Sequence, residues 1–312
     1  MNKLIRILVK TLLLVFLLFN VIIAFHAYKF THFYENGTAG IKRPEEKTGW
    51  DKTREILFGI NAEKQKNNAP DSGCQVVQLK TSNGLKLECW YNTVTNSRGT
   101  VCLFHGHGGK KSGTNDEAGA FRSMGFNTLQ VDFRAHGNSD GNTSTIGYYE
   151  SEDVKLAYDY IKGKGEKNII LWGISMGAAA VSKTIHDYPD VQPSRLILEM
   201  PFATIVQAAE GRLRLMHLPG EPLARFLIFW GGVEHAFWAF GMKPVEFVRD
   251  IKCPVLLQWG AHDPRVTRSE TDAIYQNLPG VKKLVVYDSS GHESLCKKEN
   301  LKWKTTVTEF LK

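Results

Sequence analysis

Gly173-Ile174-Ser175-Met176-Gly177 follows directly on the apolar run Asn168–Trp172. The pattern is typical of a serine on a sharp turn between a strand and a helix, which approach so closely that only glycine fits two residues to either side. The serine itself takes strained backbone angles in such a turn. A pentapeptide of this form also arises by chance, and a Gly-rich turn can serve packing alone, so the assignment depends on the rest of the chain.

A serine hydroxyl becomes a strong nucleophile only when a base removes its proton and a third group holds that base. Downstream, Asp263 follows the strand-like run Pro254–Trp259, and His292 follows the run Lys283–Tyr287. Singly, Asp263 could satisfy its own loop backbone and His292 could cap the C-terminal helix. The order serine, aspartate, histidine, with each residue just past a predicted strand, favours a catalytic triad.

A triad of this kind also needs backbone N–H groups that stabilise a developing negative charge. One is expected from Met176, and the other from the loop His105-Gly106-His107-Gly108-Gly109, where the amide of His107 supplies it. This loop follows the strand-like run Thr100–Phe104. A metal site on His105 and His107 is the competing interpretation, and it is disfavoured because no carboxylate or cysteine stands beside the two histidines.

Helical and strand-like segments alternate along the chain, which predicts an α/β domain with a mostly parallel central sheet and helices on both faces. An antiparallel hairpin about Asn83-Gly84 opens the sheet. Between residues 201 and 248 the alternation is interrupted, and we expect a helical lid. Its runs Phe226–Trp230 and Phe237–Phe240 would line a pocket for an apolar acyl chain or face a bilayer, with ordinary helix packing as the alternative. The alternating segments are Thr114–Met124, Asn127–Val131, Glu150–Lys162, Ile169–Trp172, Ala178–Asp187 and Arg195–Leu198.

From Gln75 to its end the chain resembles the α/β-hydrolase superfamily, nearest the Bem46-like and serine-aminopeptidase-like (S33) branch. The resemblance implies an α/β-hydrolase fold and no metal or organic cofactor. It also implies that Ser175 attacks an acyl carbon, that His292 acts as base and then acid, and that Asp263 orients the imidazolium. The motifs that carry it stand in family order: HGHGG at 105–109, DFRAHGNS at 132–139, GISMG at 173–177, GAHDPRV at 260–266 and SGHES at 290–294.

Three residues in or near these motifs have alternative assignments. Asp132 and His136 are interpreted as loop-fixing residues rather than catalytic ones. Glu199 ends the run Arg195–Leu198, a place where some members of the fold carry the triad acid, and Asp263 is preferred over it because of its AHDPRV context. Ala135 stands where the family commonly has glycine, in a segment that shapes a turn rather than the chemistry.

The N-terminal residues are interpreted as a membrane-targeting element. Lys3, Arg6 and Lys10 precede a nearly unbroken apolar run from Thr11 to Phe25. A spanning helix needs about 20 apolar residues and a secretory signal core about 7–15, so the run lies between the two. No Ala-x-Ala site follows it, and aromatic residues do, which favours an uncleaved single-pass anchor over a cleaved signal peptide. The basic residues before the run predict a catalytic domain on the exported side, periplasmic or extracellular.

These features divide the chain into an anchor or signal segment at 1–30, a polar tether at 31–72, and an α/β-hydrolase domain at 73–312 with its lid at about 201–248. Within the tether, Trp50–Ile60 is expected to form a short amphipathic helix. The net charge of +7 comes from scattered basic residues, so nucleic acid is not expected as a partner. Five cysteines are present; Cys74 and Cys89 would not face each other directly in the hairpin, which makes a disulfide between them doubtful.

The sequence therefore predicts a membrane-anchored serine hydrolase that cleaves a carboxylic ester, thioester or amide, with a small acyl substrate of lipophilic character. An aminopeptidase-like enzyme is the nearest alternative, and it would need acidic residues to hold a free amine, for which Glu210, Glu221 and Glu234 are candidates. Acyl transfer to an alcohol or amine stays open. A non-catalytic binding module on the same scaffold is disfavoured because all three triad residues are present.

Overall fold

An eight-stranded sheet forms the centre of the computed structural model, which describes residues 3–35 and 46–312. The strand order is β1-β2-β4-β3-β5-β6-β7-β8; β2 is antiparallel to both β1 and β4, and all pairs from β4 to β8 are parallel. The mostly parallel sheet is confirmed. Its strands are β1 (Gln75–Lys80), β2 (Lys86–Asn92), β3 (Thr100–Phe104), β4 (Asn127–Val131), β5 (Ile169–Ile174), β6 (Arg195–Glu199), β7 (Val255–Gly260) and β8 (Lys282–Tyr287).

The predicted opening hairpin is present, with Lys80 opposite Lys86 and Gly84 at a φ of +90° that favours glycine. In this register Cys89 lies opposite Val77 rather than Cys74, and all five cysteines are free thiols. Burial raises the pKa of the Cys89 thiol. The prediction that Cys74 and Cys89 do not face each other in the hairpin is therefore confirmed.

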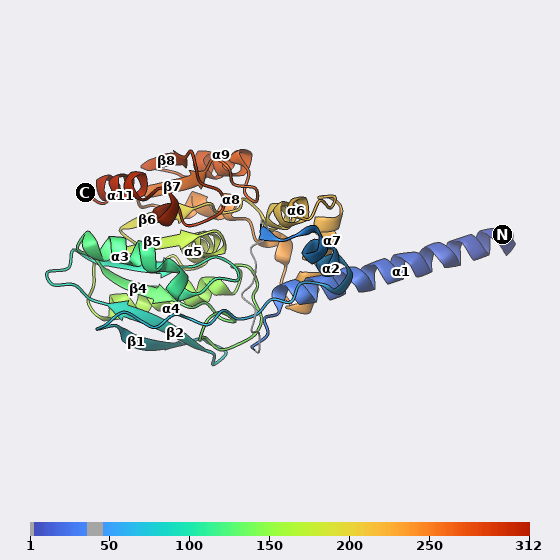
Figure 1. Cartoon of the computed structure of the whole chain (residues 1–312), viewed down its shortest axis with the longest axis horizontal. Helices are drawn as coiled ribbons and strands as arrows, with labels where there is room; N and C mark the ends of the chain where they lie inside the picture. Colours follow the sequence, from blue (N-terminus) through green and yellow to red (C-terminus); the bar gives the residue numbers. More distant parts are fainter. Residues whose placement is uncertain (1–2, 36–45) are drawn as a thin grey trace.

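Helices cover both faces of the sheet, as predicted (Figure 1). Successive side chains of a strand point to opposite faces, so Cys102 and Leu103 belong to two different cores. One core packs beneath α4, α5 and α9, and the other beneath α3, α10 and α11. The helices are α3 (Asn115–Ser123), α4 (Glu150–Gly163), α5 (Met176–Asp187), α9 (Arg268–Asn277), α10 (Leu295–Lys298) and α11 (Asn300–Phe310), with the 3-10 turn η2 (Lys111–Thr114) before α3.

The segment between β6 and β7 is helical, as expected for a lid. Its first helices lie at the end of the domain that faces the N-terminal helix (Figure 1), whereas α8 packs back against α5. The elements are α6 (Ile205–Leu215), α7 (Leu223–Glu234), η3 (Ala239–Gly241), α8 (Pro244–Phe247) and η4 (Val248–Asp250).

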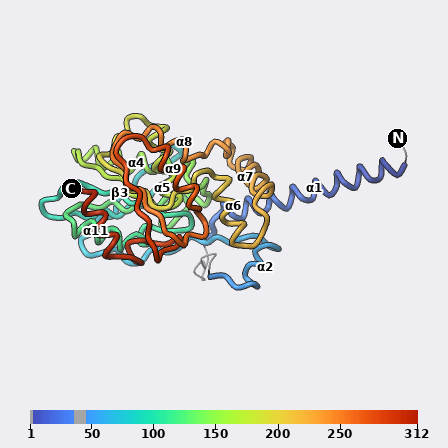
Figure 2. Tube along the Cα trace, turned by 90° about the horizontal axis from the view of Figure 1, so that it is seen from above, coloured from blue at the N-terminus to red at the C-terminus, as the bar shows by residue number. Residues whose placement is uncertain are grey.

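The N-terminal helix α1 (Lys3–Thr31) projects from this end of the domain in both perpendicular views (Figures 1 and 2). It has 29 residues, and its most apolar 18-residue window has a mean hydropathy of 2.7 with 6% of the window buried, so it is long and apolar enough to cross a membrane. The predicted helix of the tether is present as α2 (Gly49–Phe58), and none of its residues is buried. Residues 36–45 of the predicted tether lie outside the described residues.

Candidate active site

Ser175 lies at the tip of the turn between β5 and α5, with a φ of +54° and a ψ of −118°. A Cβ on Gly177 would stand 2.2 Å from the carbonyl oxygen of Phe104, and a Cβ on Gly173 would stand 2.6 Å from the carbonyl carbon of Gly177. Both contacts are with backbone atoms, which cannot shift without a large cost in free energy. The predicted strained serine and the predicted steric need for glycine are therefore both confirmed.

The structure brings Ser175, His292 and Asp263 into one hydrogen-bonded line. His292 Nε2 lies 2.9 Å from Ser175 Oγ, and His292 Nδ1 lies 2.7 Å from Asp263 Oδ2. The other carboxylate oxygen of Asp263 accepts the backbone N–H groups of Arg265 at 2.8 Å and Val266 at 2.9 Å. These partners fix the tautomer with the proton on Nδ1, so Nε2 is free to accept the proton of the serine hydroxyl.

The loop at 105–109 lies against the nucleophile, because a Cβ on Gly106 would stand 3.4 Å from Ser175 Cβ. Among the described residues, none accepts a hydrogen bond from the backbone N–H of His107 or of Met176. Both amides are thus available for a developing negative charge beside Ser175.

Two buried histidines hold this loop in place. His105 Nδ1 donates to the carbonyl of Gly106 at 2.7 Å while its Nε2 accepts the N–H of Phe133. His136 Nε2 accepts the N–H of Gly108 at 3.0 Å. His136 Nδ1 donates to the carbonyl of Arg134. Both ring nitrogens of His105 and of His136 are therefore hydrogen-bonded to backbone groups. His136 is therefore a loop-fixing residue, as predicted, and within residues 3–35 and 46–312 no group of three ligand-type side chains is placed to hold a metal.

Asp132 also fixes the loops, and its carboxylate is bound by residues outside the triad. Its carboxylate forms a fully buried ion pair with Lys111 and accepts the backbone N–H of Asn138 at 2.9 Å. Ala135 takes a φ of +64°, so it adopts the left-handed conformation that the glycine of the related motif favours. The loop-fixing assignment of Asp132 agrees with this geometry.

The ring of His107 packs between Phe30 and Phe33, at centroid distances of 4.9 and 5.2 Å. Burial, followed by the charges of His136, Arg212 and Arg265, holds the pKa of His107 well below its usual range. The ring is therefore neutral at pH 7, and it does not compete with His292 for a proton.

Glu199, the rival for the triad acid, is the last residue of β6. Its Oε1 accepts the indole N–H groups of Trp172 at 2.9 Å and Trp303 at 2.6 Å, and the amide of Gln258. Burial and the nearby carboxyl of Glu117 raise the pKa of Glu199 to about 8. Its carboxyl is therefore buried and neutral at pH 7, and it joins three side chains of the core beneath α3, α10 and α11. The acid that contacts His292 is Asp263.

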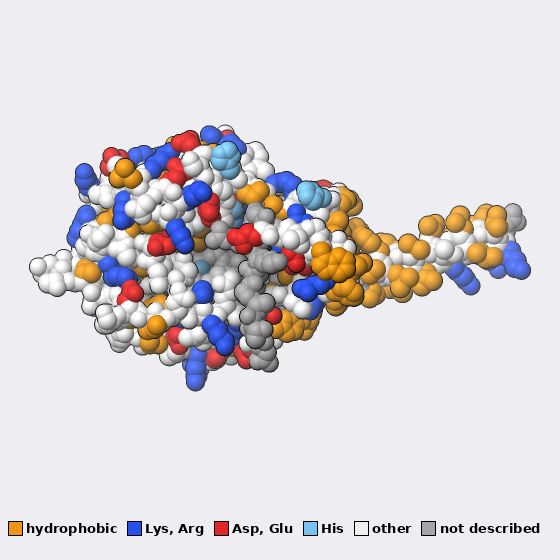
Figure 3. Space-filling model, in the orientation of Figure 1, with side chains coloured by type: hydrophobic (Ala, Val, Ile, Leu, Met, Phe, Trp, Pro, Cys, Tyr) orange, Lys and Arg blue, Asp and Glu red, His pale blue; other side chains and the backbone are white. Residues whose placement is uncertain are grey.

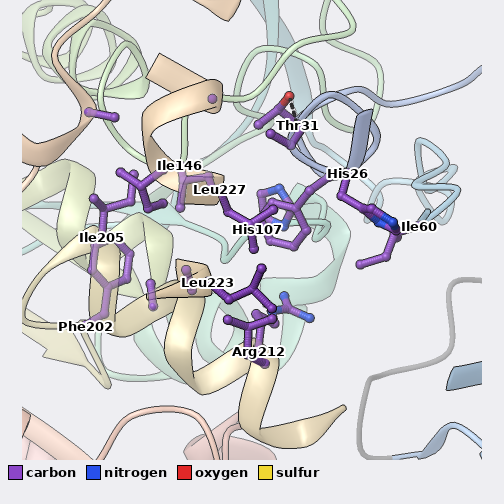
Figure 4. Close-up of a pocket in the computed structure, with 18 of the residues that line it drawn as sticks. His26, Thr31, Ile60, His107, Ile146, Phe202, Ile205, Arg212, Leu223 and Leu227 are labelled. Carbon is purple, nitrogen blue, oxygen red and sulfur yellow. Dashed lines mark hydrogen bonds between the residues drawn. The ribbon is translucent and has the colours of Figure 1, made fainter. Parts of the chain in front are cut away.

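A cavity of about 320 Å³ opens over Ser175 and His292, with walls that are mostly apolar. Its walls come from α6, α7 and the end of α1, and Figure 4 shows His26, His107 and Arg212 around the same space. From the predicted lid runs, the lining residues are Leu227, Ile228, Phe237, Ala239.

The contribution of α1 to the cavity was not predicted from the sequence. Ile23 and Ala27 line it and are 5% and 4% exposed. A membrane helix carries apolar residues on every side. Its sequence therefore does not indicate which side faces lipid and which side lines a cavity. The other α1 residues that line it are Ile22, His26, Phe30, Thr31.

Comparison with known proteins agrees with this architecture. The family described as serine aminopeptidase, S33, matches residues 95–229. The Bacillus subtilis protein YqkD, described as uncharacterized, is 28% identical over 194 residues, which cover 61% of this chain and 64% of that relative. Lysophosphatidylserine lipase ABHD12 of Xenopus tropicalis is 27% identical over 236 residues, which cover 72% of this chain and 57% of that relative. The chain thus spans less than two thirds of the length of these curated relatives.

Among solved structures, an esterase of Pyrococcus furiosus superposes with a TM-score of 0.65 at 25% identity, covering 80% of this chain and 98% of that structure. An esterase of Exiguobacterium antarcticum superposes with a TM-score of 0.58 at 18% identity, covering 76% of this chain and 99% of that structure, and this second likeness concerns the fold alone.

Proposed function

Because this chain is an α/β-hydrolase of the S33 type, we propose that it is a serine hydrolase that cleaves carboxylic esters through an acyl-enzyme intermediate. The observation that carries the proposal is the hydrogen-bonded line from Ser175 through His292 to Asp263, at the floor of an apolar cavity.

In the first half of the reaction, Ser175 Oγ attacks the ester carbonyl carbon while His292 Nε2 takes the hydroxyl proton. Asp263 stabilises the imidazolium that forms. The amides of His107 and Met176 donate to the oxyanion of the tetrahedral intermediate, which is worth about 3 kcal/mol per donor in mutational tests. His292 then gives its proton to the leaving alkoxide, and the alcohol departs.

In the second half, a water molecule attacks the acyl carbon of the Ser175 ester while His292 accepts one of its protons. Collapse of the second tetrahedral intermediate breaks the bond to Ser175 Oγ, which recovers its proton from His292. The products are a carboxylic acid and the free enzyme. Every proton in the cycle passes through His292 Nε2.

The cavity favours an apolar acyl ester over a peptide with a free amine. Glu210, Glu221 and Glu234, which an aminopeptidase-like reaction would use, are not among the described residues that line it. Glu55 does line it, but its carboxylate is paired with Lys47 at 2.6 Å. Glu221 is instead paired with Arg225 on the surface of the lid. The names of the relatives, a lysophosphatidylserine lipase and esterases, point in the same direction.

The test compares p-nitrophenyl butyrate with leucine p-nitroanilide as substrates of the parent, Ser175→Ala and the surface control Ser82→Ala. We expect the parent and Ser82→Ala to hydrolyse the ester, and Ser175→Ala to lose roughly 10³-fold or more in kcat/KM. Faster hydrolysis of the anilide than of the ester by the parent would favour the aminopeptidase alternative. Full ester hydrolysis by Ser175→Ala would overturn the proposal.

We also propose that α1 is an uncleaved single-pass anchor, with the catalytic domain on the exported side. Support comes from its length, its exposed apolar surface and the basic residues Lys3, Arg6 and Lys10 near its start. N-terminal sequencing of membrane-extracted protein should find α1 intact, and protease added outside intact cells should cut the catalytic domain. A mature chain that begins after Thr31 would contradict the anchor.

A further inference from the structure

We infer that the domain-proximal end of α1 is a wall of the acyl-binding cavity, so that the protein takes single-chain acyl esters directly from the bilayer leaflet beside its catalytic domain. The inference rests on the proposed ester hydrolysis at Ser175 and adds the substrate class and its route of entry.

One face of α1 looks into the cavity. Ile22, Ile23, His26, Ala27 and Phe30 line it, and their spacing of three to four residues places them on one side of a helix. The same cavity contains the side chains of Ser175 and His292. An acyl chain bound there would therefore contact the membrane helix and the reacting atoms at once.

The helix is fixed to the lid by specific contacts. Trp230 Nε1 in α7 donates to Asn20 Oδ1 at 3.1 Å, and His235 Nε2 lies 2.8 Å from Thr31 Oγ1. The ring of Phe19 packs edge-on against Phe226 at 5.2 Å. Polar contacts in apolar surroundings hold one register of α1 against α7 and the residue that follows it, so α1 is part of the cavity wall as well as a membrane anchor.

The cavity lies beside the domain-side part of the apolar run of α1. That run extends from Thr11 to Phe25, after Lys10, and Ile22 is the first residue of α1 that lines the cavity. At about 1.5 Å per residue, the stretch from Thr11 to Ile22 rises roughly 16 Å, about half the thickness of a bilayer's hydrocarbon core. The cavity is therefore placed beside the domain-side leaflet of the bilayer.

Exposed apolar side chains, here called the collar, lie near the base of α1, and on the face drawn in Figure 3 the apolar surface continues from α1 onto the neighbouring helices. These side chains are 46–76% exposed, and such a contiguous patch beside a spanning helix suits contact with lipid. The collar comprises Trp50, Leu57 and Phe58 around α2, Phe229 and Val233 of α7, and Trp238.

The size of the cavity selects the substrate class. About 320 Å³ lies near the lower end of the roughly 300–1,000 Å³ of small-molecule sites, which suits one acyl chain rather than the two of a diacyl lipid. A single-chain ester can slide from the leaflet between α1 and the collar with its apolar chain never exposed to water.

The test uses a dodecyl and an ethyl fluorophosphonate as probes of the full chain in phosphatidylcholine nanodiscs. Ala27→Phe pushes a ring into the cavity from α1, whereas Ala24→Phe makes the same change at a half-buried position that does not line it. We expect the ratio of the dodecyl to the ethyl labelling rate to fall about tenfold or more in Ala27→Phe and to stay within about twofold of the parent in Ala24→Phe. Should Ala27→Phe not fold, Ala27→Leu replaces it, with an expected fall of about threefold. A parental ratio in the folded Ala27 variant overturns the inference.

Failure of the proposed function has a separate signature. If neither probe labels the folded parent, Ser175 is not an activated nucleophile. The role of α1 as a cavity wall is then tested by photolabelling with a diazirine-bearing dodecanoic acid. Crosslinks to both α1 near Ala27 and α6, lost in Ala27→Phe and kept in Ala24→Phe, support the cavity wall. Equal crosslinking of the two variants overturns it.

Discussion

The indole of Trp230 in the lid donates to the side chain of Asn20 in the N-terminal helix at 3.1 Å, although the two residues are 210 positions apart in the chain. An amide in an otherwise apolar helix is costly unless it is hydrogen-bonded. This contact satisfies Asn20 and joins α1 to α7, so the helix that reaches the membrane and the lid over the candidate site form one unit.

Substitution of either partner should therefore loosen α1 from α7. Asn20→Leu leaves the indole N–H of Trp230 without its acceptor, and we expect a loss of roughly 1–3 kcal/mol in the free energy of unfolding. Trp230→Phe removes the donor, and the double variant should be little worse than either single one. Unfolding midpoints in detergent measure this double-mutant cycle, and strictly additive losses would show that the contact contributes nothing.

Asp263→Asn should impair chemistry more than binding. An asparagine can hold His292 in the wrong tautomer, and the same change in a serine protease triad lowers kcat by about 10⁴-fold. We expect a similar fall in kcat for ester hydrolysis with little change in KM. Asp288→Asn, at an exposed residue paired with Lys302, is the matched control and should resemble the parent. A loss of less than about tenfold in Asp263→Asn would assign the acid role elsewhere.

Gly177→Ala should destabilise the fold, because the added Cβ would meet the carbonyl oxygen of Phe104 at 2.2 Å. We expect a loss of about 3 kcal/mol or more, the upper part of the range for overpacking in a core. Gly163→Ala at the end of α4 meets nothing within 4 Å and should stabilise by roughly 0.5–1 kcal/mol. Thermal unfolding compares the two, and equal midpoints would argue against the close approach of β3 and α5.

The buried carboxyl of Glu199 should make stability fall as pH rises. In the unfolded chain this group loses its proton near its usual pKa of 4.5, whereas burial and Glu117 raise the folded pKa to about 8. Between these values the folded state holds more protons, so the free energy of unfolding decreases with pH, by about 5 kcal/mol in all. Denaturant unfolding from pH 5 to 8 should show this slope in the parent.

Glu199→Gln should reduce that slope and leave a remainder from other carboxyls, because burial also raises the pKa values of Glu117, Asp153 and Glu234 to about 7. Glu309→Gln, at an exposed residue paired with Lys283, keeps the full slope and serves as the control. A parental slope in Glu199→Gln would mean that the carboxylate is already ionised in the folded protein.

The sequence predicted the sheet and the positions of Ser175, Asp263 and His292 well, because their signals are local. Each of these residues follows a buried strand, and the carboxyl ends of parallel strands meet at one edge of a sheet. The hydrogen bonds that surround the buried carboxyl of Glu199 could not be predicted, since its partners Trp172 and Trp303 come from segments far apart in the chain. The cavity-lining face of α1 was hidden for the same reason, because only the distant partners of Asn20 and Thr31 distinguish it from the lipid-facing sides.

Mass spectrometry of the parent after treatment with a fluorophosphonate tests the central claim most directly. The account predicts a single adduct, on the peptide that contains Ser175, which is absent from Ser175→Ala and from heat-unfolded protein. An adduct on another residue of the folded parent, or no adduct on it at all, would contradict the assignment of Ser175 as the activated nucleophile.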